Sequence, residues 1–464
     1  MTNANEAFNQ LWHETGAPLP EAIAFQGSDP IFPVSFRIGE AGAATIAASA
    51  AMAAELWCIR GGRSQTVRVE VDAAAAAMRS TEYLRRDPPA TQPTPRSIRG
   101  LQQDIYQTRN GRWVYLHRGF PHHRARIAAV LDGADDGELL AAAVRRWDAE
   151  ALEDAIVGAG ACAGMVRSRD EWLALEQGAV IEGLPLFEVI RIGDGSPDAL
   201  PPGPRPLAGI RVVDVTRVLA GPMCARTLAE HGADVLRIGT SRLPNNELQN
   251  IDTGYGKRST VLDLTSEGGA DQLRTLIQGA DVFSQGYRPG SMANRGFGPE
   301  DIARIRPGIV YVQLSAFGHE GPWSRRRGFD TLVQVVSGMA EEYAQDGRPR
   351  LLPVSVLDYC TGYLAAFGVM IALARRARDG GSYLVRLSLA QTARWVAGLG
   401  RIPAHLTAAA PDELTAARIE QLSITSDTAY GRLSYLAPVA QLSETPTRWD
   451  RPAVPLDHDP PMWV

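Results

Sequence analysis

The chain has 464 residues, of which 45% are hydrophobic and 21% charged, so it is long and apolar enough to form large buried cores. Its net charge is only −5, and no basic tract indicates a nucleic-acid-binding surface. The four cysteines (Cys58, Cys162, Cys224 and Cys360) show no CxxC spacing, which favours reduced thiols in a cytoplasmic protein over disulfides or zinc.

The N-terminal residues are polar and lack the apolar segment of a signal peptide. The longest apolar run, 363–374, is too short to span a bilayer. We therefore expect no membrane association.

A helix–turn–strand pattern occurs near the start of the chain and again near its end. Residues 51–71 and 369–389 both indicate an apolar helix with a basic last turn, a glycine turn and a strand. An ungapped offset of 318 residues aligns them and sets Glu40 opposite Asp358. Aligning "PVS" at 33–35 with 353–355 would instead make Ile38 the partner, so the first copy does not clearly reproduce the site. A chance likeness of two such units is the alternative.

Strands alternate with helices from residue 207 onward. "GIRVVDV" (209–215), "ADVLRI" (233–238), "ADVFSQ" (280–285) and "GIVYVQLSAF" (308–317) indicate strands, and helical stretches lie between several of them. This alternation predicts an α/β fold with a doubly wound, mainly parallel sheet, whose ligands bind at the carboxyl ends of the strands. The loop "TRVLAGP" after the first strand is therefore a candidate ligand loop. Because GxGxxG is absent, a dehydrogenase is disfavoured.

Asp358 is the only charged residue in "PVSVLDYCTG", which opens the apolar helix "YLAAFGVMIALA". One explanation is structural, because a carboxylate can cap free N–H groups and interact with the helix dipole. The other is chemical, because aspartate carboxylates form covalent acyl intermediates, and N–H groups at a helix start stabilise negative charge. The segment alone leaves both open.

Five collinear stretches of residues 207–395 together resemble the family III CoA-transferases, the group of formyl-CoA and carnitine CoA-transferases. Among them are "GIRVVDVTRVLAGPMCARTLAEHGADVLRI", "GKRSTVLDLTSEGG" and "SVLDYCTGYLAAFGVMIALARRARDGG". The resemblance implies a Rossmann-like large domain with a smaller α+β domain, and a catalytic aspartate at Asp358 followed by Gly362. It implies CoA transfer through an acyl-aspartyl anhydride and an aspartyl-CoA thioester.

The resemblance also implies where coenzyme A, as an acyl-CoA substrate, is bound. The matching cofactor-binding positions are Val218, Leu219, Ala220, Leu262, Tyr287 and Arg327. Four departures from the family pattern, at Gly239, Thr240, Thr265 and Gly286, remove expected phosphate and adenine contacts. Partners implied are an acyl-CoA, a small carboxylic acid and a second copy of the chain in an interlocked homodimer.

The first half also resembles the family, but in a rearranged order. Residues 1–100 read as a partial, degenerate copy of the helix–strand part of the large domain, ending in a proline-rich linker at 85–97. Residues 101–200 resemble the small domain, 201–400 the CoA-binding large domain, and 401–464 a connection and C-terminal return segment. This order predicts a fusion of two incomplete copies.

Three further interpretations remain. A non-catalytic CoA-binding homologue fits the lost cofactor contacts. An acyl-CoA racemase of the same fold would use a histidine where Phe329 stands, with His319 only a weak substitute. The histidines His117, His122 and His123 lack cysteine or acidic neighbours, so we expect no metal site.

Overall fold

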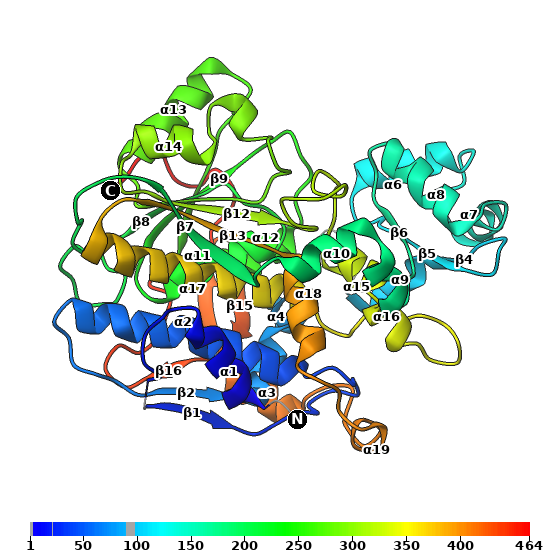
Figure 1. Cartoon of the computed structure of the whole chain (residues 1–464), viewed down its shortest axis with the longest axis horizontal. Coiled ribbons are helices and arrows are strands. Elements are labelled where there is room, and N and C mark those ends of the chain that lie inside the picture. The colour runs from blue at the N-terminus through cyan, green and yellow to red at the C-terminus, as the bar shows by residue number, and fades with distance from the viewer. Residues whose placement is uncertain (1–2, 21, 90–97) are drawn as a thin grey trace.

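The computed structural model describes residues 3–20, 22–89 and 98–464 (Figure 1). Its largest sheet contains, in spatial order, β10 (Lys257–Val261), β9 (Asp234–Gly239), β8 (Arg211–Asp214), β11 (Val282–Gln285), β12 (Val310–Ser315), β13 (Ser382–Ser388) and β7 (Phe187–Gly193). The first six strands run parallel and β7 pairs antiparallel with β13. The predicted mixed α/β class is confirmed.

The order of these strands determines where the sheet can bind a ligand. The chain runs from β8 outward to β9 and β10, and then returns to the other side of β8 to form β11, β12 and β13. Connections therefore diverge between β8 and β11, which opens a crevice at the carboxyl ends of the strands. The loops 215–219, 286–292 and 316–329 leave β8, β11 and β12 at this edge.

Helices cover both faces of the sheet, because its valine, leucine and isoleucine side chains point to both sides (Figure 1). One face packs against α11 (Ala220–Glu230) and α17 (Val356–Asp379), and the other against α13 (Glu267–Gln278) and α14 (Pro299–Ile305). Further helices in this part are α12 (Glu247–Asp252), α15 (Asp330–Val336), α16 (Met339–Glu342) and α18 (Leu389–Gly398).

Helix α17 lies beside α2 (Ile38–Ile59) at the centre of the molecule (Figure 1). Ser49 donates a 2.8 Å hydrogen bond to the Tyr363 carbonyl across the two helices. Both helices have the length and hydropathy of a membrane span, but most of their residues are buried within the protein. A buried helix that is apolar on all sides is typical of a core.

The N-terminal part forms a second, smaller sheet beneath this helix pair. Its order is β1 (Ile23–Gln26), β2 (Val67–Glu70) and β16 (Gln441–Leu442), with α1 (Ala4–His13) and α3 (Val71–Ala77) alongside. Strand β2 has a parallel neighbour on one side and an antiparallel neighbour on the other, as β13 does in the large sheet.

The sequence likeness of the two units is a structural repeat with a constant offset of 318 residues. Helix α2 begins at Ile38 and α17 at Val356, while α3 begins at Val71 and α18 at Leu389. The residues before the two long helices also share a backbone conformation, with φ −80° and ψ 63° at Arg37 and φ −89° and ψ 55° at Ser355. Glu40, and not Ile38, is therefore the counterpart of Asp358.

Residues 101–184 form a compact α+β unit to one side of the large sheet (Figure 1). It contains the sheet β4 (Ile105–Gln107), β5 (Trp113–Leu116) and β6 (Ala163–Met165), with α6 (Pro121–Val130), α7 (Gly137–Val144) and α8 (Ala149–Gly158) packed against it. Helices α9 (Arg169–Ala174) and α10 (Glu176–Gly183) then lead into β7. We call residues 101–184 the small unit.

Two predicted connections differ from the structure. In the predicted linker at 85–97, Arg85–Asp87 forms β3, which pairs with β15 (Gly431–Leu436), and 90–97 lie outside the described residues. The segment 401–430, in which the sequence favours a helical connection, has only short helices, α19 (Ala404–Thr407) and α20 (Ala416–Leu422), and ends in β14 (Ser423–Thr428). Strand pairing overrode the weak local pattern in both cases.

Candidate active site

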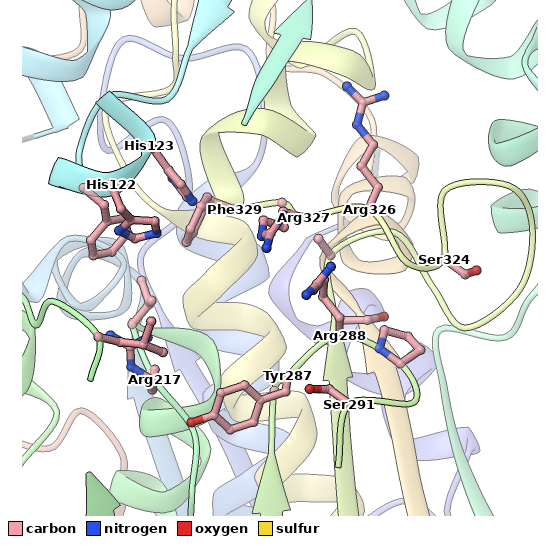
Figure 2. Close-up of a pocket in the computed structure, with 18 of the residues that line it drawn as sticks. His122, His123, Arg217, Tyr287, Arg288, Ser291, Ser324, Arg326, Arg327 and Phe329 are labelled. Carbon is pink, nitrogen blue, oxygen red and sulfur yellow. The ribbon is translucent and has the colours of Figure 1, made fainter. Parts of the chain in front are cut away.

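A cavity of about 370 Å³ opens at the carboxyl edge of the large sheet, where it meets the small unit (Figure 2). Its wall is strongly positive, because it includes five arginines and no acidic residue. The charged and polar lining residues are His122, His123, Arg126, Arg217, Tyr287, Arg288, Ser291, Ser315, Ser324, Arg326 and Arg327. We call this the large cavity.

The arginines of the large cavity are not equivalent. Arg326 turns away from its centre to pair with Glu153 of the small unit at 2.6 Å (Figure 2). Within the described part of the chain, Arg288 and Arg327 form no ion pair. Burial, followed by the like charge of Arg288, lowers the pKa of Arg327. Two crowded, uncompensated guanidinium groups indicate a site for an anion.

A second cavity of about 190 Å³, which we call the small cavity, shares Phe120, Val218 and Phe329 with the first. Asp358 lies in its wall. The other lining residues are Leu101, Asp104, His117, Arg118, Gly119, Arg124, Asn246, Gln249, Asp330, Thr331 and Ser355. Asp358 therefore lies in the wall of a cavity next to the arginine-rich one, with three lining residues in common.

Two helix starts converge on Asp358. It is the third residue of α17, and its backbone N–H donates to Asp330 at 3.0 Å. The backbone N–H of Ala220, the first residue of α11, donates to its carboxylate. Gly362, one turn further along α17, allows this approach, because a Cβ there would lie 2.5 Å from Cβ of Met223 and 2.7 Å from the Ala220 carbonyl oxygen.

Asp330, which is buried, and Asp358, which is partly buried, form a carboxylate pair. Asp330 accepts the N–H groups of Leu357 and Asp358 and so caps α17. Burial raises the pKa of Asp330 to about 6. Burial and the charge of Asp330 raise the pKa of Asp358 well above its usual range, and the Ala220 N–H opposes this shift. Asp358 is thus a poorly solvated carboxylate that keeps one preformed donor.

A strained residue follows β8 in the wall of both cavities. Val218 has φ 71°, a conformation that β-branched residues rarely adopt. The loop is fixed from below, since buried Lys257 donates to Asp214 at 2.9 Å and to the Pro222 carbonyl at 2.8 Å. Backbone strain at a position that other contacts determine is common at binding sites.

The small unit contributes polar side chains to the small cavity. Asp104 and Arg118 form a buried ion pair at 3.0 Å. The ring of His117 stacks on Phe329 with centroids 4.1 Å apart, and burial lowers the pKa of His117 to about 4. Among the described residues, its Nδ1 and Oε1 of Gln249 on α12 are buried with no hydrogen-bond partner. Both atoms are candidates to accept a hydrogen bond from a ligand.

The structure brings most of the predicted site residues together. Val218, Tyr287 and Arg327 line the large cavity, and Ala220 contacts Asp358 through its N–H. Leu219 is buried in the core behind the loop. Leu262 lies in an apolar cluster against which Tyr287 packs, and in the lining of neither cavity, so its cofactor contact stays a prediction.

Of the four departures from the family pattern, Gly286 lines the large cavity. Thr265 donates to Asp263 at 2.6 Å. Among the described residues, no group of three or more His, Cys, Asp or Glu could hold a metal ion.

Sequence reasoning missed several residues of the site. Asp330 follows Phe329, the position compared with the racemase histidine, but its capping role depends on a helix that begins 26 residues later. His117 and Asp104 come from the small unit, and nothing in the sequence indicates which carboxylate that unit faces.

The chain matches the model of CoA-transferase family III over residues 20–184 and 207–416. It is 32% identical over 323 residues to an acetyl-coenzyme A transferase of Hypoxylon pulicicidum, covering 64% of this chain and 54% of that protein. It is 34% identical over 187 residues to human α-methylacyl-CoA racemase, covering 40% and 48%. A crystal structure of a Mycobacterium tuberculosis protein matches at 30% identity, covering 42% and 57%, with a TM-score of 0.39. The chain spans about half the length of these proteins.

Proposed function

Because the chain belongs to CoA-transferase family III, we propose that it moves CoA from an acyl-CoA to a free carboxylic acid, with the Asp358 carboxylate as nucleophile. The observation that carries the proposal is that Asp358 lines the small cavity, which shares three lining residues with the arginine-rich large one. An acyl group in the small cavity and a phosphorylated cofactor in the large one would bring the thioester to this carboxylate.

The large cavity has the chemistry that CoA requires. Arg217, Arg288 and Arg327 would meet its phosphates, and the half-buried ring of Tyr287 offers an apolar face for adenine or pantetheine. The site lies at the carboxyl edge where strand connections diverge, which favours the doubly wound, Rossmann-like description of the sheet.

The proposed reaction needs no net proton transfer. An Asp358 oxygen attacks the thioester carbonyl, the C–S bond breaks, and CoA leaves as a thiolate, giving an acyl-aspartyl anhydride. The thiolate attacks the Asp358 carbonyl and releases the donor acid. The acceptor carboxylate then attacks the aspartyl-CoA thioester, again releasing thiolate. Attack of this thiolate on the new acyl carbonyl gives the product and restores Asp358.

The surrounding structure supports each of these steps electrostatically. Burial and Asp330 leave the Asp358 carboxylate weakly solvated, so it gives up little hydration when it attacks. The Ala220 N–H at the start of α11 can donate to oxygen as negative charge develops there.

The small cavity favours a short, polar acyl group. About 190 Å³ suits an acid of a few carbons rather than a long chain. Arg118 and Arg124 form ion pairs with Asp104 and Asp135. Among the described residues that line the small cavity, neither arginine is therefore left unpaired to bind a second carboxylate of the substrate. The free acceptors Gln249 Oε1 and His117 Nδ1 would instead bind a hydroxyl group. The predicted homodimer and cytoplasmic location stay predictions.

The direct test supplies the protein with short acyl-CoAs and an isotopically labelled acceptor acid, and follows label in the thioester by mass spectrometry. We expect labelled acyl-CoA, with hydroxylated short acids preferred over unsubstituted acids of equal length. Gln249→Leu should reduce that preference. Absence of any exchange across a panel of short acids would contradict the proposal and favour a non-catalytic CoA-binding protein.

A second candidate is proton exchange next to the thioester carbonyl, as the racemase relative suggests. The observation in its favour is His117, which stacks on Phe329 and shares the small cavity with Asp358. Its lowered pKa makes it a weak base, which argues against this activity. Incubation of a 2-methylacyl-CoA in D₂O should leave the α-hydrogen unexchanged; deuterium uptake that His117→Phe abolishes would favour the racemase alternative.

A further inference from the structure

The repeated helix unit places a second carboxylate pair in the molecule. Asp29 accepts the N–H of Glu40 at 2.8 Å at the start of α2, as Asp330 accepts that of Asp358 at the start of α17. Glu40 and Asp358 are each the third residue of their helix. The two halves of the chain therefore hold equivalent carboxylates in equivalent frames.

Among the described residues, Glu40, the first of these carboxylates, is buried and lines neither the large nor the small cavity. Arg37 stands where the second unit has Ser355, which lines the small cavity. The Arg37 guanidinium is buried against Glu40 at 2.7 Å, so it both fills the equivalent space and neutralises the carboxylate. A Cβ at Gly39 would lie 2.7 Å from an Asp29 oxygen, so the surroundings are closely packed.

The first unit also lacks a cofactor-binding half. In the large sheet, β12 of the second unit lies next to β11, and β11 lies next to β8. The loops after β11 and β8 line the large cavity. The counterpart of β12 is β1, the end strand of a three-stranded sheet in the described chain. Nothing equivalent to loops 215–219 and 286–292 therefore faces Glu40.

The small unit follows the first helix unit in the chain but closes over the second. Its Glu153 pairs with Arg326, and a Cβ at Gly164 would lie 3.1 Å from Cγ1 of Val336. The path from it is continuous in the described chain, since α9 and α10 lead into β7, which pairs with β13 of the large sheet. This tether holds the small unit beside the Asp358 half of the same chain.

We infer that one chain forms one complete site. The first half of the chain takes the place of a second subunit, and its small unit completes the Asp358 site within the same molecule. Glu40 takes no part in the reaction, and no second copy of the chain contributes a residue to the site. This inference rests on the proposed function for the meaning of the site. The structural part of this inference is that one chain forms the whole site, and it can be tested without measuring catalysis.

The test is a disulfide between the small unit and α15 in the full chain. Gly164→Cys and Val336→Cys are combined with Cys162→Ala, because Cys162 lies only two residues before the new thiol, next to the start of β6. The close approach of the two side-chain positions suits a disulfide. After oxidation, a non-reducing gel should show one band at the mass of a single chain, with faster migration than the reduced form.

A band at twice that mass would overturn the inference, because it would mean that the small unit covers the site of another chain. The variant with Gly164→Cys alone is the control for unrelated cross-links. Should the combined variant fail to fold, calorimetry of the parent protein with CoA replaces it. One CoA per chain at concentrations where sedimentation shows only the 50.1 kDa species supports the inference, and binding only by a dimer contradicts it. A single-chain result with no acyl transfer would refute the proposed function alone.

Discussion

Helices α2 and α17 begin with the same backbone conformation and the same capping arrangement, yet in the described part of the chain only the carboxylate of α17 lines the small cavity. At the first helix, Arg37 fills the space and pairs with Glu40. At the second, Ser355 leaves the space open and the Ala220 N–H of α11 reaches Asp358. The difference teaches that a carboxylate at the start of a buried helix becomes a candidate nucleophile through its surroundings, and not through the helix.

A raised carboxyl pKa does not distinguish the unit of α17 from that of α2. Burial raises the pKa of Asp29 to about 7 and that of Asp330 to about 6, and both residues cap helices. Raised carboxyl pKa values therefore accompany the capping role at the start of α2 as well as at the start of α17. Access to a cavity and to a cationic wall is the feature that distinguishes the candidate site.

The largest expected effect contrasts the two carboxylates directly. Asp358→Asn removes the nucleophile, so we expect the rate of acyl transfer to fall by at least about 10³-fold. Glu40→Gln keeps a hydrogen-bond acceptor for Arg37 and should leave the rate within about twofold. Steady-state assays of both variants decide the comparison. Equal losses in both would mean that the first unit takes part in the reaction.

The contact of each helix with its neighbour gives a second contrast. Gly362→Ala would force α17 and α11 apart, because the added Cβ lies 2.5 Å from Cβ of Met223, and so would withdraw the Ala220 N–H. We expect about a 10²-fold fall in kcat and a loss of about 1–3 kcal/mol in stability. The equivalent residue of α2 is Ala44, and Ala44→Gly should cost only about 1 kcal/mol with kcat unchanged. Calorimetric melting and kcat measured together would expose an error in this account if Gly362→Ala proved fully active.

Cofactor binding should depend on the arginines that line the large cavity. Arg327→Met removes a guanidinium without an ion-pair partner in the described chain, so KM for acyl-CoA should rise by about 10- to 100-fold. The matched control is Arg274→Met on α13, whose arginine pairs with exposed Asp271. Titrations at two salt concentrations should show weaker salt dependence for Arg327→Met alone. An unchanged KM would remove the large cavity from the cofactor site.

The smallest effect concerns pH. Asp358 must be ionised to attack, and its raised pKa means that kcat/KM should fall on the acid side at a higher pH than an ordinary aspartate would give. Asp330→Asn removes the like charge, so the Asp358 pKa falls and the acid limb should move to lower pH. A pH–rate profile that Asp330→Asn leaves in place would argue against the coupling.

The same pair affects stability with a defined sign. A carboxyl whose pKa is higher in the folded than in the unfolded protein stabilises the fold at low pH, and this contribution is lost as the pH rises from 3.8 to about 6 for Asp330. The difference in melting temperature between Asp330→Asn and the parent should therefore shift in favour of the variant above pH 6.

Much of the fold followed from local pattern. The β-branched runs at 209–215 and 308–317 became β8 and β12, and the apolar run after Asp358 became α17. Such segments are long and periodic enough to determine their own structure. The short strand β3 was missed, because its pairing partner β15 lies hundreds of residues away, and β14 was missed although it forms a local hairpin with β15.

The candidate site was predictable only where it lies within one half of the chain. Asp358, Val218 and Arg327 follow from the resemblance within 207–395 and meet at the two cavities. The contributions of His117 and Asp104 depend on which carboxylate the small unit covers, and that is set by packing between distant segments. Leu262 lies in an apolar cluster, so its predicted cofactor contact stays a prediction.

The most direct test of the central claim traps the intermediate. The protein is mixed with acyl-CoA and hydroxylamine, digested, and analysed by mass spectrometry. We predict a hydroxamate on the peptide that contains Asp358 and none on the peptide that contains Glu40. Both peptides remaining unmodified during measurable transfer, or modification at Glu40, would contradict the account.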